Sequence, residues 1–252
     1  MTKEIKPFLN TVTVTGADDS IPPQALIPIA ERFPFVEFGI LLSNRMSLAE
    51  GTSRFPSKNW LMQLASIAQV APLRCSGHIC GNWVHDAFRG RWPLNCGLHL
   101  LPWYKMFGAF QLNTHAEMHE LDSEAMGMML TGLLGLWPGH IIFQLDGQSG
   151  NKAAMEYKLR MPRIAGLFDM SHGTGNLPEG WPAPINGLAC GYAGGLSPEN
   201  VAEQLYKLQD LVGGLAWIDA ETSLRGEKSN GFDLDRVKKF LTAAEPWVVK
   251  AS

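Results

Sequence analysis

Cysteine is scarce in this sequence, and the few copies do not form a metal-binding or disulfide pattern. The 252 residues include four cysteines: Cys75, Cys80, Cys96 and Cys190. Cys75 and Cys80 flank His78, but this spacing is not that of a CxxC knuckle, and no second pair completes four zinc ligands. We therefore predict reduced thiols and no bound metal.

Long hydrophobic runs, leader sequences and blocks of one charge are also absent. The first ten residues, MTKEIKPFLN, lack the apolar core of a signal peptide, and no apolar run is long enough to span a bilayer. The net charge of −3 leaves no basic footprint for nucleic acid or for a membrane surface. The sequence therefore predicts a cytoplasmic protein with no nucleic-acid partner and no membrane partner.

No linker rich in serine, proline or glycine divides the chain, and its composition is that of an ordinary globular protein. Hydrophobic residues make up 46% of the sequence and charged residues 18%. A chain of this length suits either one large α/β barrel or two small domains. Because no boundary is marked, we predict a single domain over residues 1–252.

Eight short apolar or β-branched stretches alternate with helical patterns along the chain. The predicted strands are Thr11–Thr15, Val36–Leu42, Leu73–Ile79, Gly108–Leu112, His140–Leu145, Ala165–Met170, a seventh inside Leu188–Val201, and Leu215–Asp219. The predicted helices are Gln24–Arg32, a segment capped by Ser57 and ending at Val70, Asn82–Trp92, Asp122–Leu136, Lys152–Leu159, Glu199–Val212 and Leu234–Ala244. This alternation predicts the α/β class and a (β/α)8 TIM barrel. The alternative, a doubly wound open sheet, needs a GxGxxG fingerprint after the first strand, and the sequence there is Gly16-Ala17-Asp18.

The segment Leu188–Val201, LACGYAGGLSPENV, has the pattern of a strand, a tight loop and a helix start. Gly194 and Gly195 allow a positive φ and a close approach of the backbone to a ligand. Ser197 is a suitable N-cap, with Pro198 at the first helical position. Free N–H groups at such a helix start favour an anion, and a phosphate is the obvious one. The alternative is a helix cap that happens to contain two glycines.

Several segments together resemble the phosphoribosylanthranilate isomerase family. Phe168–Gly175, FDMSHGTG, is similar to that family's strand-six aspartate followed by a GxGGTG-like loop, and Ala193–Val201, AGGLSPENV, closely matches its AGGL-x-PENV. Trp217–Arg225, WIDAETSLR, resembles its strand-eight VDVSSGVE segment, and FGILL with Ser53-Arg54 and Phe110–Asn113 resemble its strands two and four. The resemblance covers most of the barrel in the right order and is most specific in the seventh unit.

This resemblance implies a phosphosugar substrate and a site for its phosphate between the last three loops. The implied phosphate donors are Gly173, Thr174, Gly175, Gly194, Gly195, Thr222 and Ser223. Arg54 matches the arginine that binds the anthranilate carboxylate, a task suited to a bidentate guanidinium. Asp169 matches the general acid that protonates the ribose ring oxygen in the Amadori rearrangement, and burial can raise a carboxyl pKa for that role.

The sequence departs from that family at the first strand, where Thr15 occupies the position of a catalytic cysteine. A threonine hydroxyl is a poor base near neutral pH without an activator, whereas a thiol titrates near pH 8.5. Other candidate bases at strand ends are Asp18, Asp19, His78, Asp146, His172 and Glu221. Of these, His78 and Asp146 follow strands three and five, whose ends face the same mouth of a barrel.

Two functions remain open at this point. The first is an isomerase of the phosphoribosylanthranilate isomerase type acting on a phosphorylated aldose-amine, with no cofactor. The second is a phosphosugar-binding barrel that has lost catalysis or acts as an epimerase or lyase. An aromatic-rich insertion at residues 82–107 has no counterpart in the family pattern, and it is interpreted either as an interface between copies of the chain or as a lid.

Overall fold

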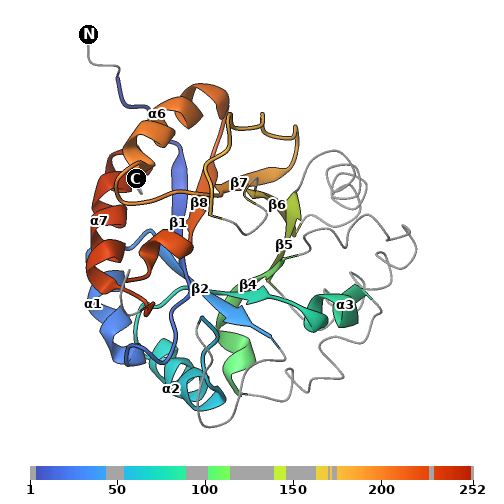
Figure 1. Cartoon of the computed structure of the whole chain (residues 1–252), viewed down its shortest axis with the longest axis vertical. Coiled ribbons are helices and arrows are strands. Elements are labelled where there is room, and N and C mark those ends of the chain that lie inside the picture. Colours follow the sequence, from blue (N-terminus) through green and yellow to red (C-terminus); the bar gives the residue numbers. More distant parts are fainter. Residues whose placement is uncertain are drawn as a thin grey trace.

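Eight parallel strands form a closed barrel, as the alternating pattern predicts (Figure 1). The computed structural model describes residues 4–43, 54–88, 102–113, 139–145, 163–169, 171, 175–226 and 230–250. The strands are β1 (Leu9–Thr15), β2 (Val36–Leu42), β3 (Cys75–Ile79), β4 (Phe107–Leu112), β5 (His140–Leu145), β6 (Ile164–Asp169), β7 (Ala189–Ala193) and β8 (Ala216–Ala220). Because β1 pairs with β8 as well as with β2, the sheet has no edge strand. The open doubly wound sheet is thereby excluded.

The strand predictions are confirmed with small shifts at their ends. The bounds of β2 and β5 are those predicted, and most of the other strands begin or end one or two residues away. Nearly continuous apolar runs produce these strands because both faces of a parallel barrel strand are covered.

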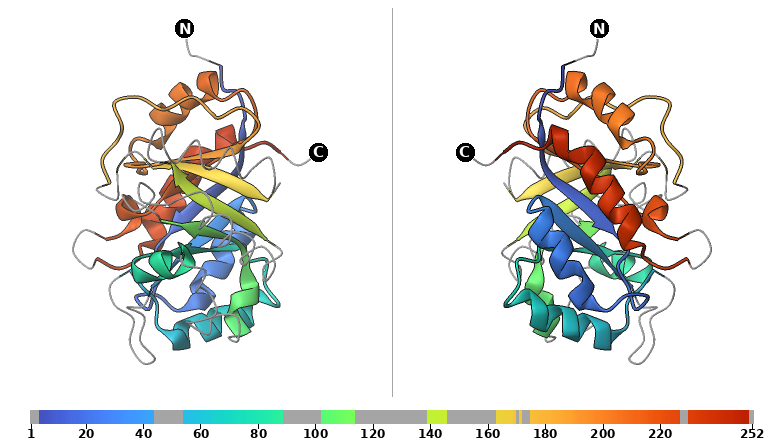
Figure 2. Two further views of the ribbon diagram at one scale, coloured as in Figure 1. Left: turned by 90° about the vertical axis from the view of Figure 1, so that its right-hand side faces the viewer. Right: turned by 90° about the vertical axis from the view of Figure 1, so that its left-hand side faces the viewer.

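Helices pack on the outside of the barrel, where Figure 2 shows α7 running along the outer side of the sheet. The described helices are η1 (Pro23–Leu26), α1 (Ile27–Arg32), α2 (Lys58–Ala68), α3 (Asn82–Phe88), η4 (Pro102–Met106), α6 (Val201–Leu211), η6 (Thr222–Leu224), α7 (Leu234–Ala244) and η7 (Glu245–Trp247). The predictions at 122–136 and 152–159, and the part of 82–92 beyond residue 88, lie outside the described residues. No helix within the described ranges is long and apolar enough to cross a membrane.

The predicted helix start at Ser57 is confirmed, whereas the predicted helix Gln24–Arg32 is divided into two short elements. Ser57 caps α2 as predicted, accepting a hydrogen bond from the Trp60 N–H at 3.1 Å. The predicted helix Gln24–Arg32 is instead a 3-10 turn followed by a short α-helix. Pro28 is the reason, because it has no N–H to donate to the carbonyl four residues earlier.

The start of α6 corrects the prediction for the seventh unit. The helix itself begins at Val201 with Asn200 as its N-cap, so Pro198 is not the first helical residue. Ser197 still caps the turn before the helix: its hydroxyl accepts from the Glu199 N–H at 3.2 Å and its carbonyl from the Val201 N–H at 2.9 Å. Asn200 folds back instead: its Oδ1 accepts from the Ser197 N–H at 2.8 Å, and its Nδ2 donates to the Gly195 carbonyl at 2.8 Å. These two bonds hold residues 195–200 as a structured turn in front of the helix.

The main apolar core lies between the barrel and the helices. The apolar cluster inside the barrel is smaller, and the barrel interior also contains polar side chains. A separate inner cluster comprises Ala109, Ile142, Ala165, Leu167 and Ala193, with Trp217 packed against it. Alternate residues of a strand face opposite sides, so Thr13, Thr15, His78 and Asp219 face inward toward the carboxyl-terminal end. Of these residues, His78 and Asp219 line the cavity described next, and Thr15 lies beneath Asp219.

Candidate functional site

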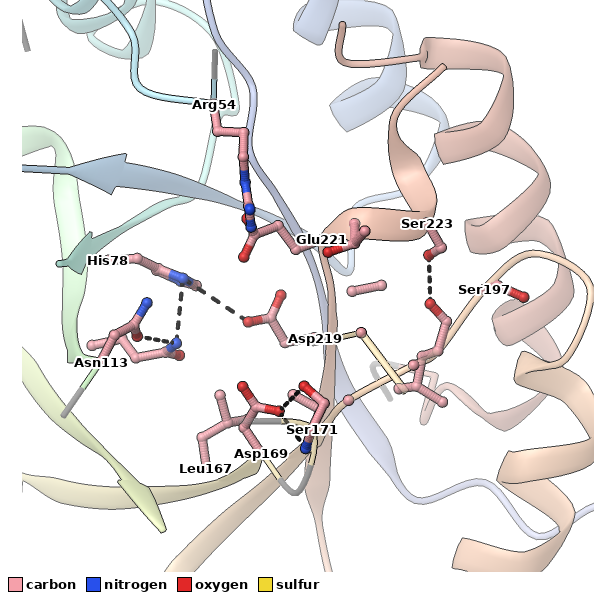
Figure 3. Close-up of a pocket in the computed structure, with 18 of the residues that line it drawn as sticks. Arg54, His78, Asn113, Leu167, Asp169, Ser171, Ser197, Asp219, Glu221 and Ser223 are labelled. Carbon is pink, nitrogen blue, oxygen red and sulfur yellow. Dashed lines mark hydrogen bonds and ion pairs between the residues drawn. The ribbon is translucent and has the colours of Figure 1, made fainter. Parts of the chain in front are cut away.

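A cavity of about 320 Å³ opens at the carboxyl ends of the barrel strands (Figure 3). This is the end at which barrels of this class carry their sites. Its described lining is Arg54, His78, Gln111, Asn113, Leu167, Asp169, Ser171, Gly175, Ala193, Gly194, Gly195, Leu196, Ser197, Asn200, Asp219, Ala220, Glu221, Thr222 and Ser223. The fold therefore brings most of the described site predictions to one place. Gly173, Thr174, Asp146 and His172 lie outside the described residues.

The loops after β6, β7 and β8 meet at one side of this cavity. Gly175, with a φ of +74°, lies so close to Thr222 that a Cβ on the glycine would be 3.5 Å from the threonine Cβ. Gly195, with a φ of +66°, lies against residues 176–177, and an added Cβ would be 2.3 Å from the Leu177 nitrogen. Gly195 thus has a packing reason as well as a conformational one, whereas Gly175 has the conformational one, because 3.5 Å is an ordinary contact distance.

Ser223 ties two of these loops together. Its hydroxyl donates to the Leu196 carbonyl at 2.5 Å, so the side chain links the loop after β8 to the loop after β7. What this segment can offer to an anion is therefore backbone: η6 begins at Thr222, and the first N–H groups of a helix have no partner within it.

Asp169 stands at the end of β6 and is held by three donors. Its Oδ1 accepts from the Ser171 backbone N–H at 3.1 Å and from the Ser171 hydroxyl at 2.7 Å, and its Oδ2 accepts from Gln144 Nε2 at 3.0 Å. The carboxylate is therefore fixed in orientation at the wall of the cavity.

Asp219 is the main site residue that the sequence analysis missed. In the barrel register, Asp169 pairs with Ala193 and Ala193 pairs with Asp219, so the two carboxylates occupy the same level of the interior. Only the small side chain of Ala193 stands on the strand between them, and both face the cavity in Figure 3. The signal was present in the sequence, because the predicted eighth strand ends at this aspartate.

The environment of Asp219 brings the pKa of its carboxyl group close to neutral pH. Its side chain is 7% exposed. Burial is the largest influence and raises its pKa to about 7; the Thr15 hydrogen bond opposes this shift, and the negative charges of Asp169 and Glu37 add to it.

Thr15 lies beneath Asp219 and does not line the cavity. It is fully buried, and its hydroxyl donates to Asp219 Oδ1 at 2.7 Å. Gly39 makes room for this arrangement, since a Cβ there would be 2.1 Å from the Thr15 oxygen and 2.9 Å from the His78 ring. The hydroxyl at the first strand is therefore directed at a carboxylate.

His78 lines the floor of the cavity as a neutral imidazole. Gln111 Nε2 lies 3.3 Å from Nδ1, and because an amide nitrogen donates, Nδ1 accepts and Nε2 carries the proton, facing Ser76 Oγ at 3.2 Å. Burial lowers the pKa of His78 to about 3. Its Nδ1 is 4.0 Å from Asp219 Oδ2, which is beyond hydrogen-bonding distance.

At the mouth of the cavity, Arg54 is paired with another lining residue. Its Nη2 donates to Glu221 Oε1, and its backbone N–H donates to Asp18 Oδ2 at 3.0 Å. Asp18 also accepts a hydrogen bond from Arg225 Nη2 at 2.6 Å. Burial acts to raise the pKa of Asp18, but the hydrogen bonds from Ser20 and Arg225 outweigh burial, so the pKa is lowered. Asp18 thus binds both Arg54 and Arg225 and fixes this wall of the cavity.

Asp19, another predicted candidate base, is not part of the cavity. It accepts hydrogen bonds from the Ser57 backbone and hydroxyl, each at 2.6 Å, and so braces the start of α2. Among the described residues, no group of three or more His, Cys, Asp or Glu side chains could hold a metal ion.

The fold and the site define a TIM barrel with a polar cavity at the carboxyl ends of its strands, and comparisons with known proteins extend this only at the level of fold. No family model matches the sequence, and no curated protein matches it. Among solved structures, the chain is similar to Sph3 of Aspergillus clavatus in complex with GalNAc, with 12% identity and a TM-score of 0.52, over 95% of this chain and all of that one.

Two further solved structures are more distant in shape. A citrate lyase from Burkholderia xenovorans LB400 has 9% identity and a TM-score of 0.49, over 96% of this chain and 78% of that one. A probable tagatose 6 phosphate kinase from Sinorhizobium meliloti 1021 has 10% identity and a TM-score of 0.46, over 85% and 65%. Of these three structures, Sph3 alone has a TM-score above 0.5, and at 12% identity that likeness concerns the fold and nothing about the reaction.

Proposed function

We propose that this protein binds a phosphorylated aldose-amine and isomerises it to the corresponding ketose-amine, as the resemblance to phosphoribosylanthranilate isomerases implies. The observation that carries the proposal is the pair of carboxylates, Asp169 and Asp219, at one level of the barrel beside the three converging loops. Two carboxyl groups in different environments are a recurrent way to supply an acid and a base from one site.

The phosphate lies, in this proposal, where the loops after β6, β7 and β8 meet. Backbone N–H groups would be its main donors, from Gly173 to Gly175, from Gly194 and Gly195, and from Thr222 and Ser223. The convergence of these loops supports the assignment, because two of the glycines are in direct contact with the neighbouring loops. An anion held by N–H groups needs no cation of its own.

The reaction needs one proton given and one proton taken. Asp169, in its protonated form, donates a proton to the ring oxygen, which opens the ring and leaves a protonated imine (an iminium ion) at C1. The Asp219 carboxylate then removes the proton from C2, and the resulting enolamine tautomerises to the ketone. No atom is gained or lost, and a base with a pKa of about 7 is well matched to neutral pH.

Thr15 acts in this scheme through Asp219. The hydrogen bond of 2.7 Å from its hydroxyl fixes the carboxylate and favours the ionised form, which is the form that a base requires. Thr15 is thus a positioning residue, and a base in the cavity replaces the cysteine of the first strand.

The second candidate is a phosphosugar-binding barrel without this isomerase activity. One observation favours its epimerase form: two carboxylates separated by a small side chain also suit removal and return of a proton at a carbon beside a carbonyl. The form that has lost catalysis is favoured only by the threonine at the position of the cysteine.

A direct assay separates these functions. The purified protein is incubated with N-(5-phosphoribosyl)aniline and with N-(5-phosphoribosyl)anthranilate, and ketose-amine formation is followed by its absorbance. We expect turnover of at least one substrate, and loss of turnover in Asp219→Asn. Binding of ribose 5-phosphate without turnover of either amine would favour the second candidate, and no binding of any phosphate compound would refute both.

A further inference from the structure

We infer that the end of the substrate opposite its phosphate is uncharged and rich in hydrogen-bond donors, because Glu221 already occupies the guanidinium of Arg54. The inference rests on the proposed function and narrows its substrate class. It also departs from the carboxylate-binding role that the resemblance implies for Arg54.

The pairing is built into the wall of the cavity. Arg54 Nη2 donates to Glu221 Oε1, and Figure 3 shows the two side chains directed at each other across the mouth. Their side chains are 40% and 25% exposed, so both are within reach of a ligand. The pair is therefore part of the surface that a substrate meets.

Both partners are held in place by their own elements. The Arg54 backbone has a φ of 78°, and its N–H is bound to Asp18, which the buried Arg225 also holds. Glu221 directly follows β8 and comes two residues after Asp219, so the pleat directs both carboxylates to the same side. The backbone is therefore anchored at both positions.

The charges around the cavity disfavour another anion at this end. Among the described lining residues Arg54 is the one cation, and it faces three acids, Asp169, Asp219 and Glu221. His78 adds no positive charge, because its burial keeps it neutral. A ligand carboxylate would have to share Arg54 with Glu221 and would lie next to the negative charge of that carboxylate.

The same pair offers complementary groups to a neutral ligand. Glu221 and Asn113 present acceptor oxygens, and Arg54 retains N–H groups beyond the one bound to Glu221. Hydroxyl or amine groups can bind at this end without breaking the ion pair. A phosphosugar amine with no carboxylate on its amine substituent fits this description.

Two ligands that differ only in a carboxylate test the inference. They are the stable product-type compounds 1-(phenylamino)-1-deoxyribulose 5-phosphate and 1-(2-carboxyphenylamino)-1-deoxyribulose 5-phosphate, measured by calorimetry at pH 7.5. We expect the wild type to bind the phenyl compound at least tenfold more tightly. In Glu221→Gln, Arg54 is released and the preference should shrink to less than threefold or reverse.

The matched control is Glu245→Gln. Glu245 also pairs with an arginine, Arg32 at 2.9 Å, but lies outside the cavity, so the preference should be unchanged. Tighter binding of the carboxylate compound by the wild type, or a preference unaffected by Glu221→Gln in a protein with an unchanged circular dichroism spectrum, would overturn the inference. Failure of the proposed function looks different, since neither compound nor ribose 5-phosphate would then bind.

Discussion

On the β6–β8 side of the cavity three loops meet through glycine-containing backbone, whereas on the β2–β4 side the wall consists of side chains that are bound to each other or, across the mouth, to the loop after β8. Gly175, Gly194 and Gly195 bring three loops into contact on the first side. On the second side, Arg54 is paired with Glu221, and His78 is bound by Gln111. The backbone side corresponds to the segments of closest sequence resemblance, and the side-chain side is where this chain departs from it.

In the proposed function, this difference gives the two sides of the cavity different roles in binding the substrate. Backbone N–H groups bind a phosphate whatever molecule carries it, so a motif there predicts the phosphate and little else. In the proposed function, side chains such as Arg54 and His78 on the opposite wall would contact the rest of the substrate. Substrate specificity would then be decided on that wall, whereas the two carboxylates of the proposed reaction lie at the ends of β6 and β8.

The largest effect is expected at the carboxylate pair of the β6–β8 side. Asp169→Asn and Asp219→Asn each remove a proton-transfer group without changing its size, so turnover should fall by about 10²-fold to 10⁴-fold. Stopped assays with the phosphoribosylamines measure this loss. Turnover within threefold of the wild type in either variant would remove that residue from the mechanism.

The pH dependence of turnover identifies which way the proton moves. If Asp219 is the base, the rate should rise with pH through about 7 as its carboxyl ionises. A rate that falls through the same range would assign the donor role to Asp219 and the acceptor role to Asp169. A flat profile across that range, with chemistry rate-limiting, would contradict both roles for Asp219.

The backbone side is tested by Gly195→Ala. The added Cβ meets the backbone of residues 176–177 at 2.3 Å, and the position has a positive φ. We expect a loss of about 2–4 kcal/mol in the free energy of unfolding in urea, together with weaker binding of ribose 5-phosphate. Gly213→Ala is the control, because a Cβ there meets nothing within 4 Å, and its change should stay within about 0.5 kcal/mol.

The shifted pKa values of Asp219 on β8 and His78 on β3 should make the free energy of unfolding depend on pH. The folded state raises the pKa of Asp219 from 3.8 to about 7, which makes the free energy of unfolding fall as pH rises between these values. It lowers the pKa of His78 from 6.5 to about 3, which makes the free energy of unfolding rise with pH over that range. The two contributions oppose each other between about pH 4 and pH 6.5.

Replacing Asp219 should leave the pH dependence that comes from His78 without an opposing contribution. In Asp219→Asn, the free energy of unfolding should rise with pH more steeply than in the wild type, by about 1.4 kcal/mol per pH unit between pH 4.5 and pH 6. Urea titrations at several pH values measure the slope. Equal slopes in the two proteins would show that Asp219 does not change its protonation in this range.

The smallest expected effect comes from Thr15→Val, which keeps the shape and removes the hydroxyl. Without its donor, the pKa of Asp219 should rise further, so the midpoint of the pH–rate profile should move to higher pH, with a roughly tenfold lower rate at pH 7. Thr15→Ser retains the hydroxyl and should restore the midpoint. A midpoint that does not move in Thr15→Val would assign Thr15 a packing role alone.

The sequence alone determined the barrel and the place of the loops after β6, β7 and β8, because the strands are contiguous runs and each loop lies beside its own strand. Tertiary structure decided what the side chains do. Asp219 becomes a candidate base only when barrel closure places it over Thr15, 204 positions away in the sequence, and Arg54 meets Glu221 across 167 positions. Burial and distant charges set the pKa of Asp219, and no local pattern contains either.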